Sequence, residues 1–198
     1  MDEEGLEAVT MRRIGRELDV EAMSLYNHVE DKEDILDSIC EEAMMDFRIP
    51  QVEGWPNAVR AMSHEYRRLL RAHPNVITLM TERKRPFTNP EALRVYEHAL
   101  QLLRSAGLSG AETVKAFRAV GSYILGFVTM ELGVMIGAAT DAAHVQAHEE
   151  MARMVESAPL PCLREALPHF IDTEVEEQFE YGVDLLIEGI QASIAAGE

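Results

Sequence analysis

A short polar cluster near the N-terminus carries side chains whose chemistry suits the reading of nucleic acid. Ser24, Asn27 and His28 recur on one face of a predicted helix over 21–28, with Met23 beside them. Hydroxyl, amide and imidazole groups can hydrogen-bond base edges or phosphates, and an apolar side chain can touch a thymine methyl. These residue types therefore suit recognition in the major groove of DNA, provided that the fold presents them there.

The surrounding sequence predicts a helix-turn-helix that would present this cluster. Thr10 can cap a first helix over 11–18, and Asp19 begins the turn that leads into the second helix. Asp31 caps a third helix that runs to about Phe47, and Asp34 completes a capping box with a shorter acid than usual. Five apolar residues would form the buried side of the corner: Ile14, Leu18, Val20, Leu25 and Val29.

The charge distribution counts against DNA binding by this segment. The net charge is −17, and residues 1–47 hold four Lys/Arg against 15 Asp/Glu, while the remainder holds 14 against 20. Affinity for DNA follows local neutralisation of phosphates, and Arg12, Arg13 and Arg16 gather on one predicted helix. On spacing alone, a three-helix corner with a solvated polar face remains the competing interpretation.

The rest of the chain has a helical pattern broken by Gly and Pro. Asn89 caps a helix that begins at Pro90, and Ser109 and Glu112 form an S-x-x-E capping box. The sequence predicts an all-α protein with a headpiece over 1–47 and an antiparallel helical domain over 48–198. Further helices are predicted over 56–73, 75–81, 90–105, 110–136, 141–157 and 174–195, with one short helix within 158–168.

The N-terminal run GLEAVTMRRIGRELDVEAMSLYNHVEDKEDIL resembles the headpiece of the TetR family of bacterial repressors. The matching parts are Gly5 and Thr10, the I-G-x-x-L core from Ile14, and the pattern L-Y-x-H-V-x-x-K that begins at Leu25. Five later runs resemble the C-terminal domain of the tetracycline-repressor subgroup: GWPNAVRAMSHEYRRLLRAHP, RP at Arg85–Pro86, LLRSAGLS, AVGSYILGF and FEYGVDLLIEGI. These matches follow in order along nearly the whole chain.

The resemblance implies that double-stranded operator DNA is a partner. The family has a longer first helix before the position of Gly5, so either the true start lies upstream of Met1, or the sequence is truncated, or the headpiece is incomplete. A missing first helix would expose the inner faces of Ile14, Leu18 and Leu25. By the resemblance, the residues that hold phosphates would be Thr10, Arg12, Arg13, Tyr26 and Lys32. Those that face bases would be Ala22, Met23, Ser24, Asn27 and His28.

The resemblance also implies a site for a small-molecule effector among the helices of the second domain. Its candidate lining is Met62, Tyr66, Leu69, Met80, Thr81, Arg85, Phe87, Val95, Leu103, Val114, Phe117 and Met130. This methionine-rich set favours an apolar or mixed ligand, although ordinary core packing is the competing interpretation. The positions of the magnesium ligands in tetracycline repressors hold Thr81 and Met130 here, so we expect neither magnesium nor tetracycline, and no other metal or cofactor.

Two predicted helices carry apolar repeats that suit a homodimer interface. Gly182 and Gly189 would allow close approach, and two helices from each chain could form a four-helix bundle. A two-fold protein fits a palindromic operator, whereas a monomeric core could use the same faces. The interface residues are predicted to be Ile124, Val128, Leu132, Phe179, Val183, Leu186 and Ile190.

Other classes of function lack a matching set of residues. His144 and His148 are four apart without a third metal ligand at clear spacing, and no nucleophile or phosphate-binding motif occurs. No apolar run is long enough for a membrane span, and Cys40 and Cys162 suit a reducing cytoplasm. We expect a ligand-released repressor and no enzyme; the alternative is a small-molecule-binding bundle that senses or sequesters its ligand without binding DNA.

Overall fold

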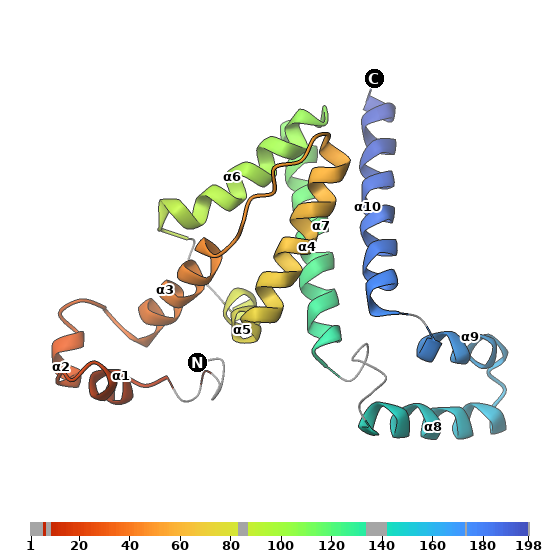
Figure 1. Ribbon diagram of the computed structural model, residues 1–198, viewed down its shortest axis with the longest axis horizontal. Coiled ribbons are helices and arrows are strands. Elements are labelled where there is room, and N and C mark those ends of the chain that lie inside the picture. Colours follow the sequence, from red (N-terminus) through yellow and green to blue (C-terminus); the bar gives the residue numbers. More distant parts are fainter. Residues whose placement is uncertain (1–5, 7–8, 83–86, 134–141, 173, 198) are drawn as a thin grey trace. The chain divides into compact units, whose positions relative to one another are not determined.

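The chain is all-α, as predicted. The computed structural model describes residue 6 and residues 9–82, 87–133, 142–172 and 174–197, which form ten helices and no strand (Figure 1). None of the described helices is both long and apolar enough to cross a membrane. The chain divides into two compact units, residues 1–121 and 122–198.

The first three helices have the predicted order and capping residues. α1 (Met11–Glu17) begins after Thr10, whose Oγ1 accepts a hydrogen bond from the backbone N–H of Arg13 at 3.2 Å. α2 (Ala22–Leu25) is shorter than the predicted helix over 21–28, because the chain turns after Leu25. α3 (Lys32–Met45) follows Asp31.

Two aspartates cap α3 reciprocally, which confirms the predicted capping box. An Asp31 carboxylate oxygen accepts from the backbone N–H of Asp34 at 2.9 Å. The carboxylate of Asp34 in turn accepts from the backbone N–H of Glu30 at 2.6 Å, one residue before the cap. In the usual capping box the acid accepts from the N–H of the cap residue itself, so the partner here lies one residue earlier than in that motif.

The first unit continues with a core of packed helices. α4 (Trp55–Ala72) contacts both α5 (Pro74–Glu82) and α6 (Pro90–Ser105), and the first half of α7 (Gly110–Glu131) follows. α3 packs on both α5 and α6 through a buried face, so it belongs to the same compact unit as this core. That face consists of Cys40, Glu41, Ala43 and Met44. The predicted caps are confirmed at Asn89 for α6, and at Ser109 and Glu112 for α7.

The second unit holds the end of α7 with α8 (Ala142–Ser157), α9 (Pro161–Asp172) and α10 (Val175–Gly197). The Tyr123 ring lies 5.9 Å from that of Phe179 between centroids, and its hydroxyl donates to the Phe179 carbonyl oxygen at 2.9 Å. α9 is longer than the short helix predicted there and contains Pro168 in its interior, which removes one backbone hydrogen bond. α7 ends at Glu131, earlier than predicted.

Candidate functional site

The helix-turn-helix corner depends on close contact between the backbones of α1 and α2. A Cβ added at Gly15 would lie 2.8 Å from the carbonyl oxygen of Val20 and 3.1 Å from the backbone nitrogen of Ala22. The turn between the two helices includes Asp19, whose φ of 54° lies in the left-handed region that aspartate tolerates better than most residues. Val20 then donates its N–H to the carbonyl oxygen of Gly15 at 2.9 Å.

The outward face of α2 and the turn after it expose most of the predicted base-reading residues. Met23 is 72% exposed, and Asn27 and His28 are also exposed. Ala22 and Ser24 are partly buried beside the corner. Met23, Asn27 and His28 are therefore the members of that predicted set with side chains most free to reach a base edge.

The predicted phosphate-binding residues differ in how available they are. Arg12 is exposed and Tyr26 is 50% exposed, whereas Thr10 uses its hydroxyl as the cap of α1. The ammonium of Lys32 lies 3.4 Å from the carbonyl oxygen of Leu6, to which it donates a hydrogen bond. Because Asp31, Glu33 and Asp34 surround the start of α3, their carboxylates oppose a phosphate there.

The predicted burial of two apolar residues in this corner is wrong. Leu18 is 62% exposed and Val20 is 43% exposed, whereas Ile14, Leu25 and Val29 are partly buried. The helices meet through the bare backbone at Gly15, so Leu18, the C-cap of α1, lies beyond that contact. The expected shortening of the first helix falls on residues 1–5, 7 and 8, which, with Gly5 among them, lie outside the described residues.

Several predicted effector-site residues meet in an aromatic cluster within the first unit, which we define as Tyr66, Met80, Phe87, Tyr96 and Phe117. The Tyr66 hydroxyl donates to the sulfur of Met80 at 3.3 Å. Tyr96 lies between Phe87 and Phe117, at centroid distances of 5.2 Å and 5.4 Å. Burial raises the pKa of the Tyr66 phenol, and the nearby Tyr96 and Cys40 raise it further, so this phenol stays protonated at neutral pH.

The other predicted lining residues are more dispersed. Leu69 and Leu103 are buried in the core, Met62 and Val95 are partly buried, and Val114 is 41% exposed. The hydroxyl of Thr81 bonds carbonyl oxygens of its own helix. Met130 belongs to the second unit and is exposed, and Arg85 lies outside the described residues. Sequence reasoning chose Val95 and missed its neighbour Tyr96, because both positions fit a partly buried helix face.

A buried carboxylate joins α3 to the segment that carries Phe87. Glu41 is only 7% exposed, and its Oε1 accepts from the backbone N–H of Thr88 at 2.6 Å and from the Thr88 hydroxyl at 3.3 Å. Phe87, the residue before Thr88, contacts the Tyr96 ring. Phe87 of the aromatic cluster is therefore adjacent in sequence to the residue that hydrogen-bonds α3. Sequence reasoning missed Glu41, since nothing distinguishes it from the other acids of this acidic helix.

Two known protein-family domains match consecutive segments that together make up almost all of the chain. Residues 1–39 match the family described as "Bacterial regulatory proteins, tetR family", and residues 49–194 match "Tetracyclin repressor-like, C-terminal domain". The chain belongs to the TetR family. It is therefore a ligand-responsive DNA-binding regulator.

Similar proteins of the TetR family extend along the whole chain. The repressor DrrR1 of Streptomyces coeruleorubidus is 28% identical over 98% of this chain and 74% of its own length. Tetracycline repressor protein class D of Escherichia coli is 27% identical over 99% of this chain and 86% of its own length. Among solved structures, apo ActR of Streptomyces coelicolor superposes with a TM-score of 0.84 at 23% identity, covering 100% of this chain and 91% of that one.

Most of the predicted dimer-interface residues are already buried within this TetR-family chain. Ile124, Val128, Phe179, Val183 and Ile190 are each at most 7% exposed, which leaves them little surface for a second chain. Leu186 is partly buried and Leu132 is 48% exposed. A Cβ added at Gly182 would overlap the Tyr123 side chain, so this glycine serves packing within the second unit. The exposed residues of these helices include Gly126 and Met130 on α7, and Tyr181, Leu185 and Gly189 on α10.

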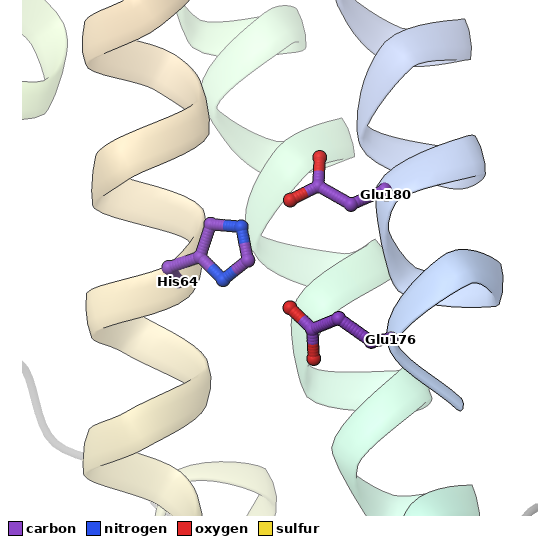
Figure 2. Close-up of side chains that lie close together, drawn as sticks. All are labelled: His64, Glu176 and Glu180. Carbon is purple, nitrogen blue, oxygen red and sulfur yellow. The ribbon is translucent and has the colours of Figure 1, made fainter. Parts of the chain in front are cut away.

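Acidic side chains on α10 could contribute to a cation site. Glu176 and Glu180 are one helical turn apart and extend from the same side of α10 (Figure 2). His64, also drawn there, lies on α4, which belongs to the first compact unit. The side chains of His144 and His148 are outside the described part of the chain. Two adjacent carboxylates on an exposed helix are common on a solvated surface, so no metal is assigned here.

Proposed function

We propose that this chain is a repressor that binds a palindromic operator as a homodimer and leaves it when a small effector binds. The observation that carries the proposal is the exposure of Met23, Asn27 and His28 on a corner held by Gly15. α3 follows that corner and packs against α5 and α6, which carry part of the aromatic cluster. One helix therefore follows the reading surface along the chain and packs against helices of the expected effector site.

We propose that contacts to DNA divide between phosphates and bases. Arg12, Arg13 and Tyr26 would hold phosphates, while Met23, Asn27 and His28 would face bases. Lys32 is a weaker candidate because its ammonium bonds the Leu6 carbonyl and adjoins the acidic start of α3. Since few cations face many acids in the headpiece, binding would be weak on random DNA and would fall steeply with salt.

The names of similar proteins support a small-molecule effector. One relative is a tetracycline repressor, and the solved structure of ActR in complex with actinorhodin has a TM-score of 0.81 at 23% identity, over 98% of this chain and 91% of that one. We propose that the effector of this chain binds at the aromatic cluster. The test is to add actinorhodin, as the first probe, to the operator complex and to measure release of the DNA. If no small molecule in a wider aromatic library releases the operator, the proposed effector response is wrong.

We propose that Glu41 transmits the effector signal to α3. A ligand that moves Phe87 would displace Thr88 from the Glu41 carboxylate and change the packing of α3 on α6. α3 would then shift the reading corner, so that the two headpieces of the dimer no longer match successive major grooves.

Replacement of Glu41 by leucine is expected to weaken this coupling and to destabilise the chain. Loss of the acceptor leaves the Thr88 N–H without its carboxylate partner, at a cost of about 1–3 kcal/mol in the free energy of unfolding. Glu41→Gln keeps an acceptor oxygen and is the matched control. Urea unfolding measures the stability, and operator affinity with and without effector measures the coupling. Equal stability and equal effector response in Glu41→Leu and the wild type would contradict the proposed role.

We propose that the dimer forms through the exposed face of α7 and α10 rather than through the residues first predicted. Tyr181 is 68% and Leu185 is 51% exposed, and a Cβ at Gly126 or Gly189 would meet no atom within 4 Å. Small residues beside exposed apolar ones allow two helices to approach closely and bury apolar surface. A four-helix bundle made of two helices from each chain fits this arrangement.

The Leu185→Glu variant is expected to raise the dimer dissociation constant at least about tenfold, because it would bury a carboxylate without a partner. Leu93→Glu on α6 is the matched control, since Leu93 is 42% exposed in the first unit. Sedimentation equilibrium at several protein concentrations distinguishes the two variants. A Leu185→Glu protein that dimerises like the wild type would contradict this choice of interface.

A further inference from the structure

The segment that joins α3 to α4 is held by side chains of α4 itself. α3 ends at Met45 and α4 begins at Trp55, and the linker between them, residues 46–54, runs back along α4 (Figure 1). The guanidinium of Arg68 donates from Nη2 to the carbonyl oxygen of Asp46 at 3.0 Å. A side chain of α4 therefore holds the first residue after α3.

Glu65 and Arg68 form a bidentate ion pair at the same place. Nε and Nη2 of Arg68 donate to the two carboxylate oxygens of Glu65 at 2.8 Å and 2.6 Å. That carboxylate also accepts the backbone N–H of Arg48 at 2.9 Å, so it holds the linker as well. Burial raises the pKa of the Glu65 carboxyl, but the hydrogen bonds from Arg68 and Arg48 outweigh burial and keep this pKa below its ordinary value. Glu65 is therefore ionised at neutral pH, and charge strengthens each of these hydrogen bonds.

These contacts differ in kind from the packing that holds the rest of α3. α3 packs on α5 and α6 through a buried face that is apolar except for Glu41. Apolar packing is non-directional, whereas a bidentate pair that binds two backbone groups requires a narrow geometry. We define the linker latch as Glu65 and Arg68 with the Asp46 carbonyl oxygen and the Arg48 N–H. This latch fixes the end of α3 against α4.

We propose that Arg68 is a positioning residue for operator binding, and that through the linker latch it sets the separation of half-sites that the dimer accepts. This inference rests on the proposed function in taking the chain as a dimeric repressor. The reading corner directly precedes α3 and belongs to the same compact unit as α4. Because a dimer reads two half-sites a whole number of helical turns apart, a change in the direction of α3 moves both corners away from their grooves. Arg68 acts through the linker and not by contact with DNA.

Spacing selectivity tests this role, because it is a ratio of two affinities and does not change when part of the protein is unfolded. Affinity is measured for the palindrome selected from random duplex DNA, and for versions with one base pair added or removed between the half-sites. The wild type is expected to prefer the selected spacing by at least about tenfold. In Arg68→Met, which keeps an apolar stem, the preference should fall by at least about threefold; solvent at the partly exposed Arg68 limits the effect.

An ion pair on α6 supplies the matched control. Nη1 of Arg94 lies 2.9 Å from a carboxylate oxygen of Glu91, with the same spacing of three residues. Arg94→Met should therefore leave the spacing preference unchanged. Exchange of the charges by Glu65→Arg with Arg68→Glu keeps an ion pair within α4. The exchange presents each linker group with a side chain of the wrong hydrogen-bonding type, so it should not restore the preference.

A measurement without DNA separates the failure of this inference from the failure of the repressor proposal. Hydrogen exchange of the Arg48 amide, followed by NMR, should be at least about threefold faster in Glu65→Leu than in the wild type. Arg68→Lys is a milder variant that cannot hold both groups in a fork, so its spacing preference should be intermediate.

Three results would overturn the inference while the repressor proposal stands. They are a wild-type spacing preference in Arg68→Met, a preference restored by the charge exchange, and equal exchange of the Arg48 amide in Glu65→Leu and the wild type. A wild-type protein that binds no operator at any spacing would overturn both proposals together. Circular dichroism of each variant confirms that it is folded.

Discussion

The Gly15→Val variant is expected to bind operator DNA at least about a hundredfold more weakly than the wild type, which corresponds to about 2.7 kcal/mol. Even a Cβ would lie 2.8 Å from the Val20 carbonyl oxygen and 3.1 Å from the backbone nitrogen of Ala22. These are backbone atoms of the turn and of α2, so they cannot yield as a flexible side chain would. A branched side chain at this position must therefore separate α1 from α2 and misdirect Met23, Asn27 and His28.

The same variant should keep its folded core, because α4 to α10 make no use of Gly15. Circular dichroism and thermal unfolding check the core, and fluorescence anisotropy of a labelled operator measures the affinity. Gly110→Val is the matched control: a Cβ there meets only the side chain of Arg104, at 3.8 Å. Operator affinity in Gly15→Val within a factor of a few of the wild type would show that the α1–α2 contact does not control the reading surface.

The Gly182→Ala variant is expected to lower the free energy of unfolding by about 1–3 kcal/mol, the usual cost of overpacking a core. The added Cβ would overlap the ring and hydroxyl of Tyr123. That ring is held by contact with Phe127 and Phe179, and its hydroxyl donates to the Phe179 carbonyl oxygen at 2.9 Å. The side chain therefore cannot move away without losing a hydrogen bond and two aromatic contacts.

Gly189→Ala is the control for this second prediction, since an added Cβ there meets no atom within 4 Å of the chain. Alanine favours a helix over glycine by up to about 1 kcal/mol, so a monomer should gain stability. If Gly189 lies in the dimer interface, the same change should weaken dimerisation instead. A double variant with Tyr123→Ala should recover part of the Gly182→Ala loss, because removing the ring removes the overlap. If the losses in the free energy of unfolding of Gly182→Ala and Tyr123→Ala simply add in the double variant, as measured by urea unfolding, the assigned clash is contradicted.

The helix boundaries were predictable where local chemistry determines them. Thr10, Asp31, Asn89 and Ser109 all cap helices as the sequence indicated, because a cap needs only a side-chain oxygen and a free backbone N–H within three residues. The all-α class was also predictable from local sequence, because the apolar residues recur at helical spacing throughout the chain. The prediction that the second helix runs over 21–28 is wrong at its C-terminal end, because no residue in the sequence marks the turn after Leu25.

The functional contacts were less predictable because they depend on which face of a helix meets which neighbour. Ile124, Val128, Phe179 and Val183 were predicted to meet a second chain, yet the structure buries them within one chain. Apolar spacing identifies a buried face but does not distinguish a partner helix of the same chain from one of another. The Glu41–Thr88 contact joins residues 47 positions apart, so no local pattern could reveal it.

Selection of bound sequences from random duplex DNA, followed by titration of the winner across salt, tests the central claim most directly. The account predicts a palindrome whose affinity falls steeply with salt, with a shallower salt dependence in Arg12→Ala and weaker binding in Tyr26→Ala. Each lost phosphate contact should reduce the slope of log affinity against log salt by about 0.9. No enriched sequence even at low salt, from a folded protein that dimerises, would contradict the account and leave the effector site as the function to pursue.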